Sequence, residues 1–392
     1  MGKPVHFTPV GANLLAPAKV AGTGVAHVLA GAGCTGLQAG NALPYAAANL
    51  NMRVVNAMLG LGRGGLEESF VVYHEALRAA GHEVASLLDP RAAVLDDVRR
   101  LEVPLLPVRT WTRWDPLTVW RVRRILRRWN PDVILVHGNR AGRLLLRAAR
   151  GRWPVIARLP NYRFQRLLRC DGFIAILPDQ RTALVRAGVP EERIFTIPSM
   201  LPRLPARRAE GPLPARVGAM GRFHPVKGLD VFLRALRWLK DQGVPFQAVL
   251  AGDGELREPL QRWTREWGLE TDVTFPGWVD DKAAFFHSLG VFCLTSHHEA
   301  FARVMLEAMA HEVPLVVTDS EGPRQIIEHE RTGLVVPRGD PVALGRAIMR
   351  LLQNPAEARG LARQARAKVE STYTIEATAP LLQRALETVA AR

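Results

Sequence analysis

From Arg53 onward, short apolar runs alternate with longer segments of helical spacing. The run VVNAML is followed by the helix-like LEESFVVYHEALRAAG, and DVILVHG is followed by NRAGRLLLRAARG. Consecutive parallel strands must be joined by a crossover, usually a helix, so both faces of such a sheet are covered. The alternation therefore predicts an α/β fold built on parallel sheets.

The alternation is interrupted once, by the proline-rich segment SMLPRLPARRAEGPLPAR at residues 199–216, and then restarts with ARVGAMG. A chain of 392 residues suits two domains, each with its own core. We therefore predict two Rossmann-like lobes joined by a hinge. The expected boundaries are an N-terminal domain over 52–200, a linker over 201–214, a C-terminal domain over 215–375, and a C-terminal helix over 376–392 that could pack back on the N-terminal domain.

Residues 1–51 differ from the rest of the chain. They are rich in Ala and Gly, carry no acidic residue and show no clear helical or strand period. We expect a flexible, disordered extension or an over-called translation start, with the folded core beginning near Met52. No stretch of the chain has the apolar length of a transmembrane helix, and no signal peptide is expected.

The formal charge of +15 is concentrated in one part of the chain. Residues 53–210 hold 28 basic and 15 acidic residues, whereas residues 211–392 hold 22 of each. Such an excess indicates an anionic partner. No nucleic-acid-binding module is recognisable, so we expect no nucleic acid partner and favour an acidic acceptor or an anionic membrane surface.

A basic stretch and the cysteines bear on location. RVRRILRRW at residues 121–129 could form a basic amphipathic helix on a membrane, with Val122, Ile125 and Trp129 on one side. The alternative is an ordinary covering helix with a solvated arginine face. The three cysteines are scattered, which favours a reducing cytosol. We expect a cytoplasmic protein, peripheral at the inner face of the cytoplasmic membrane.

Two loops of the second half could bind phosphate. GRFHPVKGLD places Arg222 and Lys227 between a strand and a helix, where two cations at the carboxyl end of a parallel strand suit a diphosphate. AGDGE places Gly252 and Asp253 after another strand, and the glycine lets the backbone approach a ligand closely. Taken singly, the first loop is better explained as a solvated turn and the second as a tight strand-to-helix turn.

The segment SHHEAFARVMLEAMAHE carries Glu299 and Glu307, eight residues apart, with helical apolar spacing between them. Two carboxylates so placed could accept hydrogen bonds from different hydroxyls of one extended ligand. The first-turn amides between Phe301 and Val304, which include those of Ala302 and Arg303, could bind a phosphate.

Together these motifs resemble the retaining nucleotide-sugar glycosyltransferases of glycosyltransferase family 4, which have the two-Rossmann GT-B fold. The resemblance covers about residue 53 to the C-terminus. It rests on five motifs in order, namely GRFHPVKGLD, AGDGEL, VTFPGWV, the E-x(7)-E pair and RTGLVVP.

The resemblance implies roles for single residues. Arg222 and Lys227 would bind the donor diphosphate, Glu299 would hold hydroxyls of the donor sugar, and Glu307 would bind the ribose. His137 matches the histidine that approaches the donor sugar.

In the first lobe, Gly64 and Gly65 match the glycine-rich loop near the phosphates and the acceptor.

Three positions depart from the family pattern. Ala300-Phe301-Ala302 replaces Gly-Phe-Gly, Gln325 stands where Glu is common, and Ser199-Met200 replaces Asn-Gly.

The implied activity is transfer of a hexose from a nucleotide-sugar donor to a cell-envelope glycolipid or to a lipopolysaccharide or polysaccharide precursor. The reaction would retain the anomeric configuration and need no metal or other cofactor, and the chain contains no Asp-x-Asp pair. A nucleotide-sugar epimerase of the same fold is the alternative. The neighbours His297 and His298 have poor zinc spacing and are expected to be structural.

Overall fold

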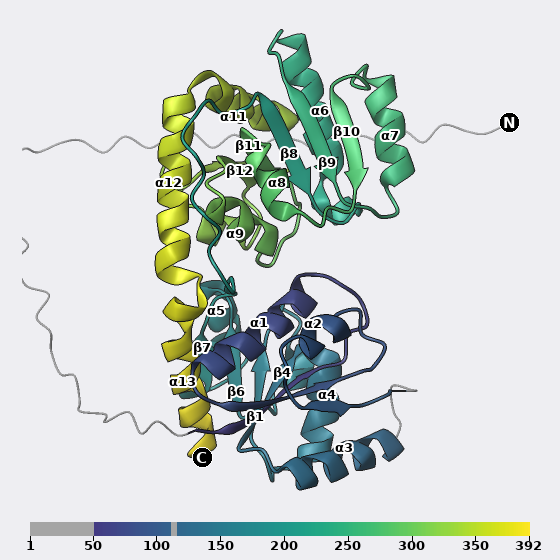
Figure 1. The fold of residues 1–392 in the computed structure, drawn as a ribbon, viewed down its shortest axis with the longest axis vertical. Helices are drawn as coiled ribbons and strands as arrows, with labels where there is room; N and C mark the ends of the chain where they lie inside the picture. Colours follow the sequence, from purple (N-terminus) through teal and green to yellow (C-terminus); the bar gives the residue numbers. More distant parts are fainter. Residues whose placement is uncertain (1–50, 111–115) are drawn as a thin grey trace, which may run out of the picture. The chain divides into compact units, whose positions relative to one another are not determined.

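The computed structural model describes residues 51–110 and 116–392, so all but the last residue of the predicted extension, 1–51, lies outside the described residues. The chain forms two parallel sheets with covering helices (Figure 1). The strand orders are β3-β2-β1-β4-β5-β6-β7 and β10-β9-β8-β11-β12-β13. This confirms the predicted α/β fold with two Rossmann-like sheets.

The first sheet and its helices form the N-lobe. One core lies between the sheet and α3 and α4, and another lies between the sheet and α1. Its strands are β1 (Arg53–Met58), β2 (Glu83–Leu88), β3 (Leu105–Pro107), β4 (Val133–His137), β5 (Val155–Arg158), β6 (Gly172–Ala175) and β7 (Ile194–Thr196). Its helices are α1 (Gly65–Ala79), α2 (Leu95–Arg99), α3 (Pro116–Trp129), α4 (Gly138–Ala149) and α5 (Pro178–Arg186).

The second sheet and its helices form the C-lobe, with cores on both faces. Its strands are β8 (Arg216–Met220), β9 (Gln247–Ala251), β10 (Val273–Gly277), β11 (Val291–Leu294), β12 (Leu315–Thr318) and β13 (Leu334–Val336). Its helices are α6 (Leu229–Asp241), α7 (Arg257–Glu266), α8 (Lys282–His287), α9 (Arg303–Ala310), α10 (Pro323–Ile326), α11 (Pro341–Gln353) and α12 (Pro355–Thr372).

The last helix, α13 (Ile375–Ala390), returns to the N-lobe. The Thr374 hydroxyl caps its first turn by accepting a hydrogen bond from the Ala377 amide at 3.2 Å. Its buried face, which includes Leu382 and Val389, belongs to the same apolar core as strands of the first sheet. The end of the chain therefore helps to build the lobe in which the chain begins its fold.

The apolar side predicted for residues 121–129 faces the protein. Val122 and Trp129 are buried in the core of the N-lobe, and Ile125 packs against that core. This side of α3 therefore covers the sheet and is not free to enter a membrane. Of the two interpretations of this segment, the structure agrees with the covering helix.

Candidate functional site

A cavity of about 700 Å³ lies where loops from the two lobes meet. The loops follow the carboxyl ends of strands in both sheets, which is where open α/β sheets bind ligands. All predicted site residues except His137 line this cavity, namely Gly64, Gly65, Arg222, Lys227, Gly252, Asp253, Glu299, Phe301, Ala302, Arg303, Val304 and Glu307. The fold thus brings motifs from both halves of the sequence to one place.

Lys227 and Glu299 form an ion pair inside the cavity. The Lys227 Nζ atom lies 2.5 Å from Oε2 of Glu299, and the Ser296 hydroxyl donates to the same oxygen at 3.3 Å. The lysine is the last residue of a short turn, Pro225–Lys227, and Gly228 follows it with a φ of +58°. A Cβ at Gly228 would lie 2.3 Å from the Thr295 carbonyl oxygen. Only glycine fits this close approach, so the backbone fixes the position from which the Lys227 side chain extends.

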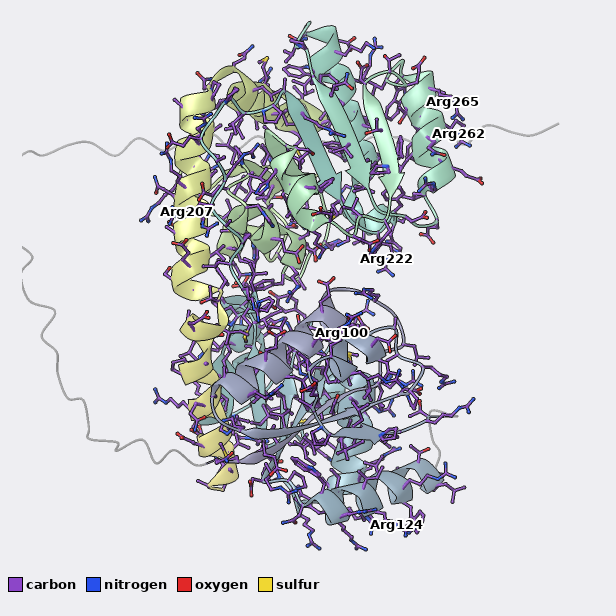
Figure 2. The ribbon with its side chains drawn as sticks, in the orientation of Figure 1. Arg100, Arg124, Arg207, Arg222, Arg262 and Arg265 are labelled. Atoms are coloured by element: carbon purple, nitrogen blue, oxygen red, sulfur yellow. The ribbon has the colours of Figure 1, made fainter. Side chains whose placement is uncertain are left out.

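Arg222 extends from the carboxyl end of β8 and is exposed at the cavity (Figure 2). Within the described residues its guanidinium has no carboxylate partner. The neighbouring loop holds Gly252 at φ +125°, where a Cβ would lie 1.9 Å from the Gly221 carbonyl oxygen. The two loops therefore touch through backbone, and Arg222 and Asp253 lie side by side at the cavity wall.

The N-terminus of α9 points its first-turn amides at the cavity. Ala302 precedes the helix in the left-handed region at φ +61°. An L-residue costs about 1 kcal/mol there relative to glycine, the residue common at this position in the resembling family. The amides of Arg303 and Val304 have no partner within the helix, so they can donate to an anion.

Glu307 belongs to an ionic cluster that joins the lobes. The Lys282 Nζ atom lies 2.9 Å from Glu307 Oε1 and 3.5 Å from Glu68 Oε1. Arg303 Nε donates to Glu68 Oε2 at 3.0 Å. Sequence reasoning missed Glu68 and Lys282. Glu68 lies three residues after Gly65, and Lys282 lies three residues after the motif VTFPGWV.

His137 does not reach the cavity. It ends β4 with 1% of its surface exposed, and its Nε2 lies 2.8 Å from Asn56 Oδ1. Phe70 and Tyr73 stack edge-on against the ring. Burial, and then the nearby Arg158, hold the pKa of His137 well below its ordinary value. The predicted approach of His137 to a donor sugar is therefore not supported by this geometry.

Arg158 is a cavity residue that sequence reasoning missed. It ends β5, is only 3% exposed and donates to the hydroxyls of Ser199 at 2.6 Å and Ser69 at 3.3 Å. Burial lowers its pKa. Neither hydrogen-bond partner is charged, and a buried cation without a counter-charge is costly. The only sequence signal was a cation directly after the apolar run VIA.

Two departures from the family pattern make specific contacts. Ser199, in place of Asn, accepts the hydrogen bond from Arg158. Gln325, in place of Glu, accepts a hydrogen bond from the Asp179 amide of the N-lobe at 3.1 Å. Ser199 therefore holds a cavity residue through a neutral group, and Gln325 joins the C-lobe to the N-lobe.

The cavity wall carries six basic and five acidic side chains. Across residues 51–110 and 116–392, no group of three or more His, Cys, Asp or Glu side chains is arranged to hold a metal ion. No helix in the same part of the chain is long and apolar enough to cross a membrane.

Two family models match the chain, one in each lobe. "Glycosyltransferase Family 4" matches residues 63–201, and "Glycosyl transferases group 1" matches residues 208–368. The protein has two lobes, each built on a parallel sheet, with a cavity between them. This is the architecture of a GT-B glycosyltransferase. The matches and the relatives described next show that the chain is a glycosyltransferase and belongs to glycosyltransferase family 4.

The relatives are similar over most of their length. The lipopolysaccharide core biosynthesis glycosyltransferase LpsD of Rhizobium meliloti (strain 1021) is 31% identical over 313 residues, which cover 78% of this chain and 89% of the relative. LpsE of the same organism is 28% identical over 322 residues, which cover 80% of this chain and 93% of the relative. The solved structure of Anabaena Alr3699/HepE in complex with UDP-glucose superposes with a TM-score of 0.74 at 20% identity, covering 87% of this chain and all of that one.

Proposed function

We propose that this glycosyltransferase transfers a hexose from a nucleotide-sugar donor to a saccharide of a lipopolysaccharide or polysaccharide precursor, with retention of the anomeric configuration. One observation carries the proposal: the cavity gathers Arg222, Lys227, Glu299 and Glu307 with the N-terminus of α9. The names of LpsD and LpsE, both lipopolysaccharide core enzymes, support the acceptor class.

The donor diphosphate is assigned to the C-lobe. Arg222 and Lys227 supply positive charge, and the first-turn amides of α9 supply hydrogen-bond donors. In the proposed front-face reaction, the C1–O bond to the diphosphate breaks while the acceptor oxygen bonds to C1 on the same face. The acceptor proton passes to the leaving diphosphate. The protein then acts by positioning and by stabilising charge on that group.

The carboxylates orient the rest of the donor. Glu299, fixed by Lys227 and Ser296, is assigned to the sugar hydroxyls, and Glu307, fixed by Lys282, to the ribose. Trp278 lines the cavity and is half exposed, so its indole offers a surface on which a base can stack. No step in this scheme requires a metal, and we expect activity to survive a chelator.

The acceptor is assigned to the N-lobe side of the cavity. Arg158 faces the cavity there without a charged partner, which favours an acceptor with an anionic group near the reacting hydroxyl. The charge excess of residues 53–210 further supports an anionic acceptor and contact with an anionic membrane. We place the reaction at the cytoplasmic face, and the scattered cysteines, of which Cys170 and Cys293 are free and buried, support this.

The test is product analysis. The protein is incubated with each nucleotide-sugar, with and without a deacylated lipopolysaccharide core, and the product is analysed by nuclear magnetic resonance. We expect a new glycosidic bond only when both are present, with the anomeric configuration of the donor. An epimerised donor formed without any acceptor would contradict the proposal and favour the epimerase alternative.

A further inference from the structure

A second large hollow lies in the N-lobe, away from the cavity between the lobes. Its volume is about 1200 Å³, and its walls come from α3, α4, the turn before β5 and the segment before β6. Six arginines line it, and we call it the arginine groove: Arg123, Arg143, Arg147, Arg150, Arg166 and Arg169.

The groove lies at the opposite edge of the sheet from the donor cavity. Val155, the first residue of β5, lines the groove, whereas Arg158, the last residue of the same strand, lines the cavity. At about 3.3 Å per residue the strand separates the two by roughly 10 Å. The groove is therefore not part of the site described above.

Basic residues greatly outnumber acidic residues in and around the groove. Residues 116–171 contain fourteen arginines and only two acidic residues, Asp132 and Asp171. Asp171 is the only carboxylate among the lining residues, and its Oδ2 accepts a hydrogen bond from the Val155 amide at 2.8 Å. Within the described residues, Arg166 and Arg169 form no ion pair. Positive charge collected in a concave wall raises the local concentration of anions.

Hydrogen bonds to backbone carbonyls hold part of the wall together. Arg123 donates from Nε to the Ala148 carbonyl at 3.0 Å and from a terminal nitrogen to the Arg147 carbonyl at 2.9 Å, which ties α3 to the end of α4. Trp153 is buried beneath the groove. Burial, and then the neighbouring Arg150 and Arg127, lower the pKa of Arg123, as expected where like charges are held together.

We propose that the arginine groove binds a ligand that carries two or more phosphate groups. A guanidinium presents a planar fork of N–H donors that matches phosphate oxygens, and arginines on two walls can engage more than one phosphate. The walls are α3 with α4 on one side and the segment of Arg166 and Arg169 on the other. Trp120, 57% exposed at the rim, offers an apolar surface next to the phosphates, which suits phosphate borne on a lipid.

The test compares two matched double variants of the full-length protein. Arg166→Gln/Arg169→Gln removes two exposed charges, three residues apart, from the groove. Arg262→Gln/Arg265→Gln removes two exposed charges with the same spacing from α7 of the C-lobe (Figure 2). Both variants change the net charge equally, so only a built site distinguishes them.

Two probes distinguish the source of the phosphate. Sodium tripolyphosphate represents a soluble ligand and is measured by titration calorimetry. Vesicles of phosphatidylcholine with cardiolipin, a lipid with two phosphates, represent a lipid surface and are measured by sedimentation. We expect the groove variant to lose about tenfold or more in affinity for at least one probe and the α7 variant to change less than about twofold.

The pattern of losses identifies the ligand. Loss confined to vesicles assigns the groove to lipid head groups, and loss for tripolyphosphate assigns it to a soluble phosphorylated ligand. Equal losses in the two variants would show that net charge alone attracts anions, and would overturn the proposal. Unchanged binding in both would also overturn it, because any binding would then lie elsewhere, for example at Lys227. None of these outcomes depends on the identity of the sugar donor.

Discussion

The two lobes handle positive charge in different ways. In the C-lobe, arginines are matched by acids. Arg350 bridges Glu330 and Glu357, and Arg366 bonds to Glu370. In the N-lobe, the arginines of residues 116–171 outnumber the nearby acids seven to one. The lobe with the donor motifs therefore relies on a few placed cations, whereas the N-lobe offers a surplus of charge to partners.

This contrast explains why net charge alone was a poor guide to the donor site. Arg222 and Lys227 lie in a lobe whose sequence is electrically neutral, and their local loops, rather than the total charge, place them at the cavity.

The largest effects are expected at the C-lobe cavity. Lys227→Ala and Glu307→Ala should keep the fold and lower transfer about 100-fold or more, because each removes a group that we propose holds the donor. Initial rates at saturating acceptor measure the loss. Lys240→Ala is the control, since Lys240 pairs with Asp272 in the same lobe away from the cavity. Near-normal turnover in either cavity variant would undo the site assignment.

Acid should weaken the N-lobe through its buried histidines. Burial lowers the pKa of His74 from 6.5 to about 4, and burial also lowers the pKa of His137. The unfolded chain takes up protons below pH 6.5 while the folded state does not, so stability is present above pH 6.5 and is lost as the pH falls toward 4. For His74 the expected loss at pH 5 is about 2 kcal/mol, and His137 should add to it in the same direction.

Hydrogen exchange at pH 7 and pH 5, corrected for the intrinsic rate, locates this loss. Amides of β1 and β4 should lose protection at pH 5. The C-lobe should also lose some, because burial lowers the pKa of His311 to about 4. No loss in β1 and β4 would contradict the assignment of neutral, buried imidazoles.

Arg158 tests whether the N-lobe side of the cavity binds an anion. Arg158→Met should lower kcat/KM about tenfold, because the acceptor loses its cation, while the melting temperature stays the same or rises. The expected change lies in the KM for an anionic acceptor, with little change in the KM for the donor. A lower melting temperature with unchanged kinetics would show that the residue is structural instead.

The smallest effect is expected at Ala302. Because φ is +61° there, Ala302→Gly should raise the free energy of unfolding by about 1 kcal/mol. Ala308→Gly, in the middle of α9, is the control and should lower it by a similar amount. Chemical denaturation of the two variants measures both changes in the free energy of unfolding. If Ala302→Gly is less stable instead, the packing of the Ala302 methyl group contributes more than the backbone strain costs.

Contiguous motifs made much of this molecule predictable from sequence. The loops around Arg222, Gly252 and Glu299 each follow a strand directly, so periodicity and spacing placed them at the carboxyl edge of a sheet. Glu68 and Arg303 were different, because their contact joins residues 235 positions apart across two lobes. Spacing along the chain does not report such contacts.

His137 shows the other limit. Its position at the end of β4 was predictable, but successive side chains on a strand point to opposite faces, and its ring packs under Phe70 and Tyr73 instead of facing the cavity. The helix of residues 121–129 shows the same point. Its apolar spacing was visible in the sequence, but only the fold shows that the sheet already covers that side.

Nucleoside diphosphate binding tests the assignment of the donor to the C-lobe most directly. It is measured for three proteins: the unmodified chain, Lys227→Ala and Arg166→Gln/Arg169→Gln. Titration calorimetry with a panel of nucleoside diphosphates first finds the one that binds the unmodified chain. We predict that Lys227→Ala weakens the binding that selects this base about tenfold or more, whereas the groove variant keeps it, because the proposed groove binds phosphate groups without contacting a base. Unchanged binding in Lys227→Ala together with weakened binding in the groove variant would contradict the assignment of the donor to the C-lobe.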